Sequence, residues 1–251
     1  MRLLSALVVL LALLAGCSED EEPSAPVAAP SKTPEITVEE SRPAGPAVCR
    51  TATMRTARAS GDVFATCVTA ALAKHRTVRL EGEQTAGEKV IGAVAGTLRF
   101  APTHAVDMTI FNGAATLLMI GDRAWMKDDK GWVVAGESST RAQTAQTQAT
   151  LWRASSTLKA LREFYSTTSW RPSGKVEDVN GIRLREYVGA PHGPGSAGVP
   201  TEIWLSRANL PVRMVSHAQS DDGDTTNTVT LTDFGQEFEY VKPRIRRDRK
   251  R

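Results

Sequence analysis

The sequence contains little cysteine and little histidine. It contains three cysteines and four histidines, and the histidines stand apart, at His75, His104, His192 and His217. The motifs H-E-x-x-H, G-x-S-x-G and C-x-x-C do not occur. We therefore expect no catalytic residue, no metal and no cofactor. A hydrolase with an unrecognised site stays open as an alternative.

The sequence also lacks a strong excess of charge and a long apolar run. Its formal net charge is +3, which is not the strongly basic balance of a nucleic-acid-binding protein. The apolar run from Leu3 to Leu14 has about a dozen residues, too few to cross a bilayer comfortably as a helix. Arginine far outnumbers lysine and alanine is abundant, which is typical of GC-rich genomes such as those of actinobacteria.

The N-terminus has the pattern of an export signal. Met1 and Arg2 precede the apolar run, which ends in Leu14-Ala15-Gly16-Cys17. These four residues resemble the lipobox of bacterial lipoproteins. The resemblance implies removal of residues 1–16, acylation of Cys17 and anchoring to the outer face of the cytoplasmic membrane. The alternative is a plain signal peptide that happens to contain a cysteine.

Composition divides the rest of the chain into three parts. Residues 17–46 contain six prolines among Ala, Ser, Thr and Glu, which predicts a disordered tether. Residues 47–241 suit one folded domain. Residues 242–251 form a tail with seven basic residues and one acidic residue. Two interpretations of the tail stay open: contact with an anionic surface, or a disordered solubilising end.

The two remaining cysteines predict a disulfide. With Cys17 acylated, Cys49 and Cys67 would meet in an oxidising compartment, where pairing is expected. A bridge closing a loop of about 18 residues would stabilise the fold by ~3 kcal/mol in the chain-entropy model. A reactive cysteine is the alternative, without a histidine close in sequence other than His75.

Hydrophobic periodicity predicts two helical stretches separated by strands. Ser60 is a suitable N-cap for the first, whose apolar face includes Cys67. The second runs from about Thr140 to Tyr165, and the strands are expected at 77–84, 89–100, 104–111, 115–120, 124–127, 131–135, 175–179, 182–188, 201–205, 212–219 and 226–234. Asn180-Gly181 is a strong hairpin signal. The order predicts an α+β fold with a large antiparallel sheet and helices on one face.

Several short motifs resemble those of the mycobacterial LppX/LprG-type lipoproteins and, more distantly, the LolA/LolB lipoprotein carriers. They are Ala124-Trp125-Met126-Lys127 with Gly131-Trp132, Val179-Asn180-Gly181, Thr201-Glu202-Ile203-Trp204-Leu205 with Leu210-Pro211-Val212-Arg213, and Leu231-Thr232-Asp233-Phe234-Gly235. The resemblance implies a strongly curved half-barrel, with helices on its concave face and an apolar cavity between them for acyl chains. The polar stretch from Thr140 to Thr150 and the cysteine pair depart from the family pattern.

Two functions follow from this resemblance. The first is a membrane-anchored carrier of a lipid or acylated ligand, with cavity candidates Leu98, Phe100, Val106, Met108, Ile110, Leu118 and Ile120. Ordinary core packing would use the same residues, so the alternative is a non-catalytic sensor or protein-interaction module with a filled core. Its partner would be another envelope protein. No nucleic-acid partner is expected.

Two further sequence patterns resemble the motifs of known ligand sites. Residues 193–198 spell G-x-G-x-x-G, but a strand is expected after them where a dinucleotide site needs a helix. Asp221, Asp222 and Asp224 surround Gly223 without the spacing or closing Glu of a calcium loop. We interpret both as hairpin loops.

Overall fold

The computed structural model describes residues 44–50, 59–191, 198–220 and 223–245. Its helices are η1 (Ala47–Arg50), α3 (Gly61–His75), η2 (Phe111–Gly113), α4 (Thr140–Ser156) and α5 (Leu158–Ser166). Its strands are β1 (Thr77–Ala86), β2 (Lys89–Arg99), β3 (Ala105–Ile110), β4 (Ala115–Ile120), β5 (Arg123–Asp128), β6 (Gly131–Val134), β7 (Arg171–Val179), β8 (Ile182–Gly189), β9 (Thr201–Leu205), β10 (Pro211–Ser220) and β11 (Gly223–Thr232).

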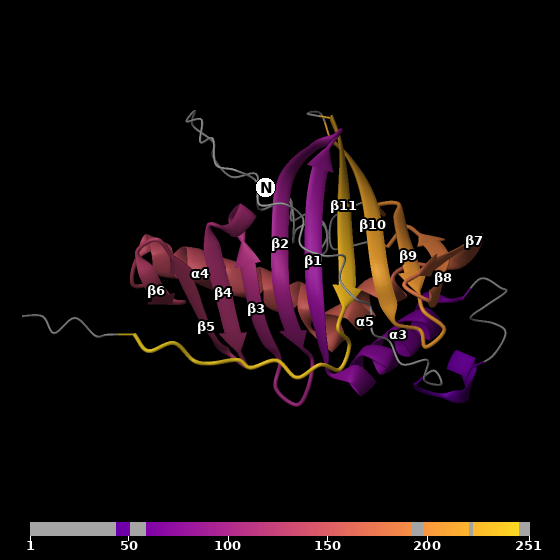
Figure 1. Ribbon diagram of the computed structural model, residues 1–251, viewed down its shortest axis with the longest axis horizontal. Helices are drawn as coiled ribbons and strands as arrows, with labels where there is room; N and C mark the ends of the chain where they lie inside the picture. Colours follow the sequence, from indigo (N-terminus) through magenta and orange to yellow (C-terminus); the bar gives the residue numbers. More distant parts are fainter. Residues whose placement is uncertain (1–43, 51–58, 192–197, 221–222, 246–251) are drawn as a thin grey trace, which may run out of the picture.

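All eleven of these strands belong to one antiparallel sheet, in the order β6-β5-β4-β3-β2-β1-β11-β10-β9-β8-β7. Two meanders meet where β1 pairs with β11, so the first and last strands lie at the centre and β6 and β7 form the open edges. The sheet curves around α3, α4 and α5, which lie on its concave side (Figure 1). The predicted α+β fold with a curved antiparallel sheet is confirmed.

The first helix, α3, is held by its cap and by the disulfide. The Ser60 side chain accepts a hydrogen bond from the backbone N–H of Val63, as its N-cap role requires. Cys67 lies on the buried face of α3 and is bonded to Cys49 of η1. The predicted pairing is confirmed, and it fastens η1 against the helix.

The second predicted helical stretch, from about Thr140 to Tyr165, consists of two helices, α4 and α5. Thr157 takes an extended conformation (φ −77°, ψ 150°) between α4 and α5. Its hydroxyl accepts a hydrogen bond from the backbone N–H of Ala160 and so caps α5. Ser155 and Ser156 donate to carbonyls one turn earlier, a local competition that weakens a helix end.

An aromatic cluster joins α3 and α5 to the β7–β8 end of the sheet. The Phe64 and Trp170 rings stack with centroids 4.8 Å apart, and Tyr165 and Tyr187 meet Phe64 edge-on. The indole N–H of Trp170 donates to the Tyr165 carbonyl at 2.8 Å. Backbone hydrogen bonds in both directions pair Trp170 with Ala59, just before α3.

After β11 the chain crosses the outer face of the sheet as a C-terminal strap (Asp233–Ile245), seen in yellow below β1–β5 in Figure 1. Arg79 pairs with Asp233 at 2.6 Å and lies over the Phe238 ring. Arg99 lies over the Tyr240 ring at 4.8 Å. The first four residues of the predicted basic tail therefore belong to the strap, and residues 246–251 lie outside the described residues.

Candidate functional site

Strand register shows which side chains face the helices. Directly paired residues of antiparallel strands share a face, and successive residues alternate. Leu98 pairs with Val106 and Val106 with Met119, so all three share the inner, concave face. The next inner row joins Met108 to Leu117 and then to Met126.

The structure separates the seven cavity candidates into three groups. Leu98 and Phe100 line a cavity between the sheet and the helices. Val106, Met108 and Ile110 are buried on the same inner face without lining that cavity. Leu118 pairs with Asp107, and Ile120 pairs with Ala105, so both lie on the outer face and take no part in the cavity.

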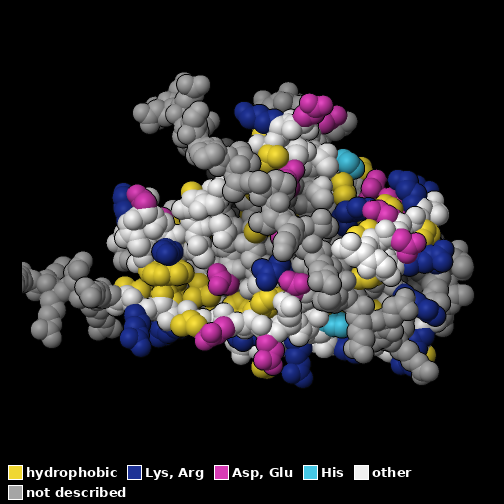
Figure 2. All heavy atoms as spheres, in the orientation of Figure 1, with side chains coloured by type: hydrophobic (Ala, Val, Ile, Leu, Met, Phe, Trp, Pro, Cys, Tyr) yellow, Lys and Arg dark blue, Asp and Glu magenta, His cyan; other side chains and the backbone are white. Residues whose placement is uncertain are grey.

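The outer-face position of Leu118 has a tertiary cause. Its cross-strand partner Trp125 is only 2% exposed although it points away from the helices. The strap runs past these strands, and Figure 2 shows hydrophobic side chains gathered on this part of the face. Both faces of β4 are therefore apolar, and its sequence shows no alternation that would assign Leu118 to one of them.

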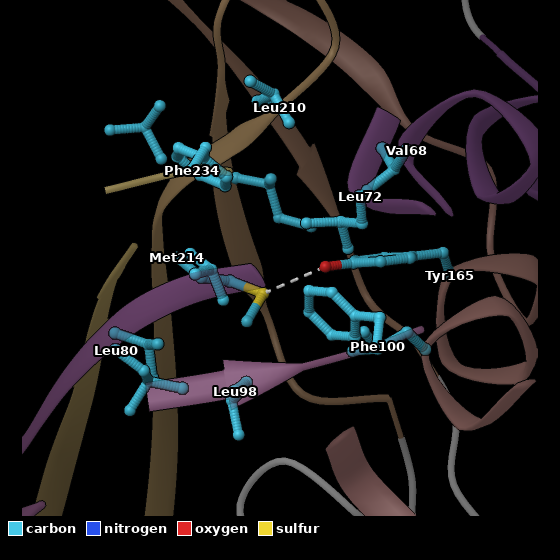
Figure 3. Packing of buried hydrophobic residues seen from close by; sticks show 14 of the residues in the cluster. Val68, Leu72, Leu80, Leu98, Phe100, Tyr165, Leu210, Met214 and Phe234 are labelled. Atoms are coloured by element: carbon cyan, nitrogen blue, oxygen red, sulfur yellow. Dashed lines mark hydrogen bonds between the residues drawn. The ribbon is translucent and has the colours of Figure 1, made fainter. Parts of the chain in front are cut away.

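The cavity lies beneath the three helices and is almost entirely apolar. Its volume is about 40 Å³, and it is lined by Leu72, Leu80, Leu98, Phe100, Trp152, Ser155, Ser156, Leu161, Tyr165, Met214, Val229 and Leu231. Figure 3 shows Leu80, Leu98 and Met214 facing Leu72 and Tyr165 across this interior. A drug-sized ligand needs roughly 300 Å³ or more, so side chains fill most of this space.

The helical half of this lining was not among the predicted site residues. Leu161 and Tyr165 lie on the buried face of α5, and Leu72 lies on the buried face of α3. The Tyr165 hydroxyl points at the Met214 sulfur, 4.0 Å away (Figure 3). Burial raises the pKa of Tyr165, so its hydroxyl stays neutral and the interior carries no charge there.

The cover over the inner face differs from one end to the other. α4 lies against β4, β5 and β6, and its buried face consists of small or polar side chains apart from Trp152: Ala142, Ala145, Gln148, Ala149, Ser155 and Ser156. Burial of small side chains stabilises a contact less, since the free energy scales with apolar area. Apart from Trp152, α4 therefore buries less apolar area per side chain than α3, whose buried face includes Phe64, Val68 and Leu72.

An arginine fastens the N-terminal end of α4 to the sheet. The Arg141 guanidinium donates to both carboxylate oxygens of Asp128 and to the Gly131 carbonyl, at the β5–β6 hairpin. The hydrogen bonds from Arg141 hold the pKa of Asp128 below its usual value. Beside this contact lies an open groove of about 630 Å³, whose apolar lining includes Phe111, Ala115 and Met126.

A histidine and a serine meet at the other end of α4. The His104 Nε2 lies 3.0 Å from the Ser156 hydroxyl, which also donates to the Trp152 carbonyl. Burial lowers the pKa of His104, and the positive charges of Arg153 and Arg99 lower it further. Within the described ranges no ion pair joins His104 to a carboxylate. The pair thus lacks the third group that orients a catalytic histidine, and it serves as a polar contact between α4 and the start of β3.

The remaining predicted features give no further site in the described part of the chain. Cys17, Gly193 to Ala197, Asp221 and Asp222 lie outside the described residues. Among the residues that are described, no group of three metal-ligating side chains comes together. In that same part of the chain, no helix combines the length and the apolar character that a membrane crossing requires.

Comparison with known proteins gives low-identity structural neighbours. No protein-family model and no curated protein matches the sequence. A LolA superfamily protein from Nitrosomonas europaea has 8% identity and a TM-score of 0.30, covering 70% of this chain and 97% of its own. A putative outer membrane lipoprotein-sorting protein domain from Vibrio parahaemolyticus has 11% identity and a TM-score of 0.27, covering 67% and 92%.

A DUF1329 family protein from Desulfovibrio piger has 10% identity and a TM-score of 0.29, covering 69% of this chain and 90% of its own. Because all three TM-scores are below 0.5, the fold described above rests on the strand order and register of this chain. None of the three is a mycobacterial LppX/LprG-type lipoprotein, and that finer resemblance stays a prediction.

Proposed function

We propose that this protein is a non-catalytic lipoprotein of the cell envelope that binds an acyl chain of a lipid or acylated molecule between its sheet and its helices. The proposal depends mainly on the apolar interior beneath α4, whose buried side chains are small or polar apart from Trp152. The enclosed cavity is lined by apolar side chains and two serines of α4. The same helix borders the open groove beside Phe111.

Movement of α4 would enlarge this interior at low cost. Lifting α4 exposes Trp152 and otherwise small or polar side chains, whereas lifting α3 or α5 would break the aromatic cluster around Phe64. The inner-face residues Met119 and Met126 lie on β4 and β5, which α4 covers. Methionine side chains are flexible and adapt to irregular apolar partners. The proposed entry route therefore runs from the groove, under α4, to the cavity.

Release of the Arg141 contact should speed up the entry of an acyl chain. We expect the Arg141→Ala variant to take up 11-(dansylamino)undecanoic acid several-fold faster than the parent, because the N-terminal end of α4 loses its link to Asp128 and Gly131. Stopped-flow fluorescence measures this rate on the full chain carrying Cys17→Ser, so that the chain's own predicted acyl groups cannot enter.

The matched control is Arg162→Ala, an exposed arginine on α5, which should leave the uptake rate unchanged. Native mass spectrometry of chain isolated from a bacterial host should show one bound lipid in a fraction of the molecules. Absence of bound lipid, together with no probe uptake by either the parent or Arg141→Ala, would refute the acyl-binding proposal.

A sensor or protein-interaction module with a filled core is the second candidate, and one observation favours it. The cavity of about 40 Å³ is close to what a small solvent molecule occupies and far below a ligand pocket. Such a module would hold a stoichiometric envelope protein and no lipid. The native mass experiment above separates the two, since a bare chain with a bound protein partner matches only this candidate.

The proposed location depends on acylation of Cys17. We expect the wild-type chain in the membrane fraction even after a wash in about 1 M salt, which screens charge contacts of the basic tail. The Cys17→Ser chain should lose labelled palmitate and leave the membrane under that wash, because acyl chains supply the hydrophobic anchoring. Fractionation followed by immunoblotting measures this, and a Cys17→Ser chain that stays in the washed membrane would contradict the anchor.

A further inference from the structure

A second pocket opens at the opposite end of the sheet, formed by β7, β8 and β9. Its volume is about 420 Å³, which lies in the size range of small-ligand sites. Its floor includes the buried side chains of Tyr187 and Leu205, and three arginines line it, Arg183, Arg185 and Arg207. No carboxylate is among the described residues that line it.

The strand register brings two of these arginines to the concave side. Arg185 pairs with Leu205 and with Val176, and Tyr187 pairs with Ile203, so these residues share the inner face. Arg183 precedes Arg185 by two positions on the same strand and has the same orientation. Arg183 and Arg185 therefore lie on the same face of the sheet as the buried Tyr187 and Leu205.

The third arginine comes from a turn that is fixed by its own hydrogen bonds. The Ser206 hydroxyl accepts from the backbone N–H groups of Ala208 and Leu210, on either side of Asn209. The Asn209 amide donates to the Cys49 carbonyl, next to the disulfide. Arg207 thus projects from a rigid turn.

Around this pocket, arginine side chains outnumber the described carboxylates available to pair with them. Arg183 and Arg207 are exposed, and neither forms an ion pair with another described residue. Asp178 lies opposite Arg183 in the register. The other nearby acids are engaged elsewhere, since Glu177 pairs with Arg213 and Glu186 with Lys175. Figure 2 shows Lys and Arg side chains around the β7–β9 end, with acidic ones among them.

We infer that this pocket binds a phosphate ester, with the phosphate on the arginines and the adjoining carbon skeleton against Leu205, Tyr187 and Val176. A guanidinium group donates two parallel hydrogen bonds to a phosphate, and several such groups around one pocket favour a multiply charged oxyanion. The apolar floor gives the organic part of the ester a surface that inorganic phosphate would leave uncovered. The pocket is distinct from the cavity under α4, so this inference does not rest on the acyl-binding proposal.

Two probes test the inference on the full-length chain carrying Cys17→Ser, so that the predicted acyl anchor cannot itself bind the vesicles. Glycerol 3-phosphate, which has no acyl chain, is titrated by calorimetry, and flotation measures binding to vesicles of phosphatidylcholine with or without phosphatidylglycerol. The Arg183→Gln/Arg207→Gln variant should bind either probe roughly tenfold more weakly or worse, because it removes charge-assisted hydrogen bonds. The matched control, Arg162→Gln, removes an exposed arginine outside the pocket and should bind like the Cys17→Ser parent.

Each result bears on the inference in one direction. Binding of glycerol 3-phosphate that the double variant loses supports a site for the phosphate ester itself. Binding only to phosphatidylglycerol vesicles, again lost in the double variant, supports the same site with a membrane lipid as its source. No binding of either probe, or binding that the double variant retains, would overturn it. The basic tail is present in every variant, so the difference in vesicle binding between the parent and the double variant measures the contribution of Arg183 and Arg207.

Discussion

The Trp170→Ala variant is expected to lose about 3–5 kcal/mol of the free energy of unfolding, because truncation of a fully buried tryptophan leaves a large cavity. Trp170 is 0% exposed and stacks on Phe64. Its indole N–H also donates to the Tyr165 carbonyl, which would be left without that partner. Urea denaturation followed by circular dichroism measures the difference.

Trp132 provides a matched control for this loss. It lies on β6 at the open edge of the sheet and is only half-buried. Trp132→Ala should therefore cost much less than Trp170→Ala, on the order of 1 kcal/mol. Equal losses in the two variants would show that the aromatic cluster does not hold α3 and α5 to the sheet as described.

Removal of the disulfide is expected to cost about 3 kcal/mol of stability, since a bridge over a loop of this length restricts the unfolded chain. The bonded residues are 18 positions apart in sequence, and both are buried. The Cys49→Ala/Cys67→Ala variant is preferable to serine, because buried hydroxyl groups without partners would add their own penalty. Thermal unfolding with and without dithiothreitol measures the effect.

The double alanine variant is also the control for the effect of dithiothreitol on the wild-type chain. Dithiothreitol should lower the melting temperature of the wild-type chain and leave that of the variant unchanged. A wild-type melting temperature that does not respond to dithiothreitol would mean that the bridge contributes little. Ligand binding to the arginine pocket can be measured in the same variant, because the turn bearing Arg207 is hydrogen-bonded to the Cys49 carbonyl through Asn209.

Trp170 and the Cys49–Cys67 disulfide, whose removal has these two large expected effects, lie at the same end of the molecule. The aromatic cluster holds α3 and α5 near β7–β8, and the disulfide joins η1 to α3, whereas α4 at the other end is held by Trp152, by small or polar side chains and by the Arg141 contact. The proposed binding mechanism requires that α3 and α5 stay fixed on the sheet while α4 moves. Substitutions at Trp170 should therefore act on stability, and substitutions at Arg141 on the rate of ligand entry.

Local sequence determined much of the fold. Most strand positions follow from period-two alternation, although β4 lacks it and β7 begins four residues before the expected strand. Asn180 and Gly181 both adopt the positive φ angles that their hairpin requires. Ser60 caps α3 because its hydroxyl reaches a backbone N–H three residues away. Order along the chain also predicted the antiparallel α+β class. These features depend on interactions between residues close in sequence, so a single sequence contains enough information for them.

Only the tertiary structure decided which face each apolar residue occupies and how much space remains inside. Leu118 faces outward, on the side of the sheet along which the C-terminal strap runs, and the strap is distant in sequence. The arginine pocket arises where β7, β8 and the turn after β9 meet, with no motif along the chain. From the sequence alone, the scarcity of histidine and the lack of a known catalytic motif were the main observations that bear on function. The cavity and the arginine pocket depend on side chains from separate elements, which only folding brings into contact.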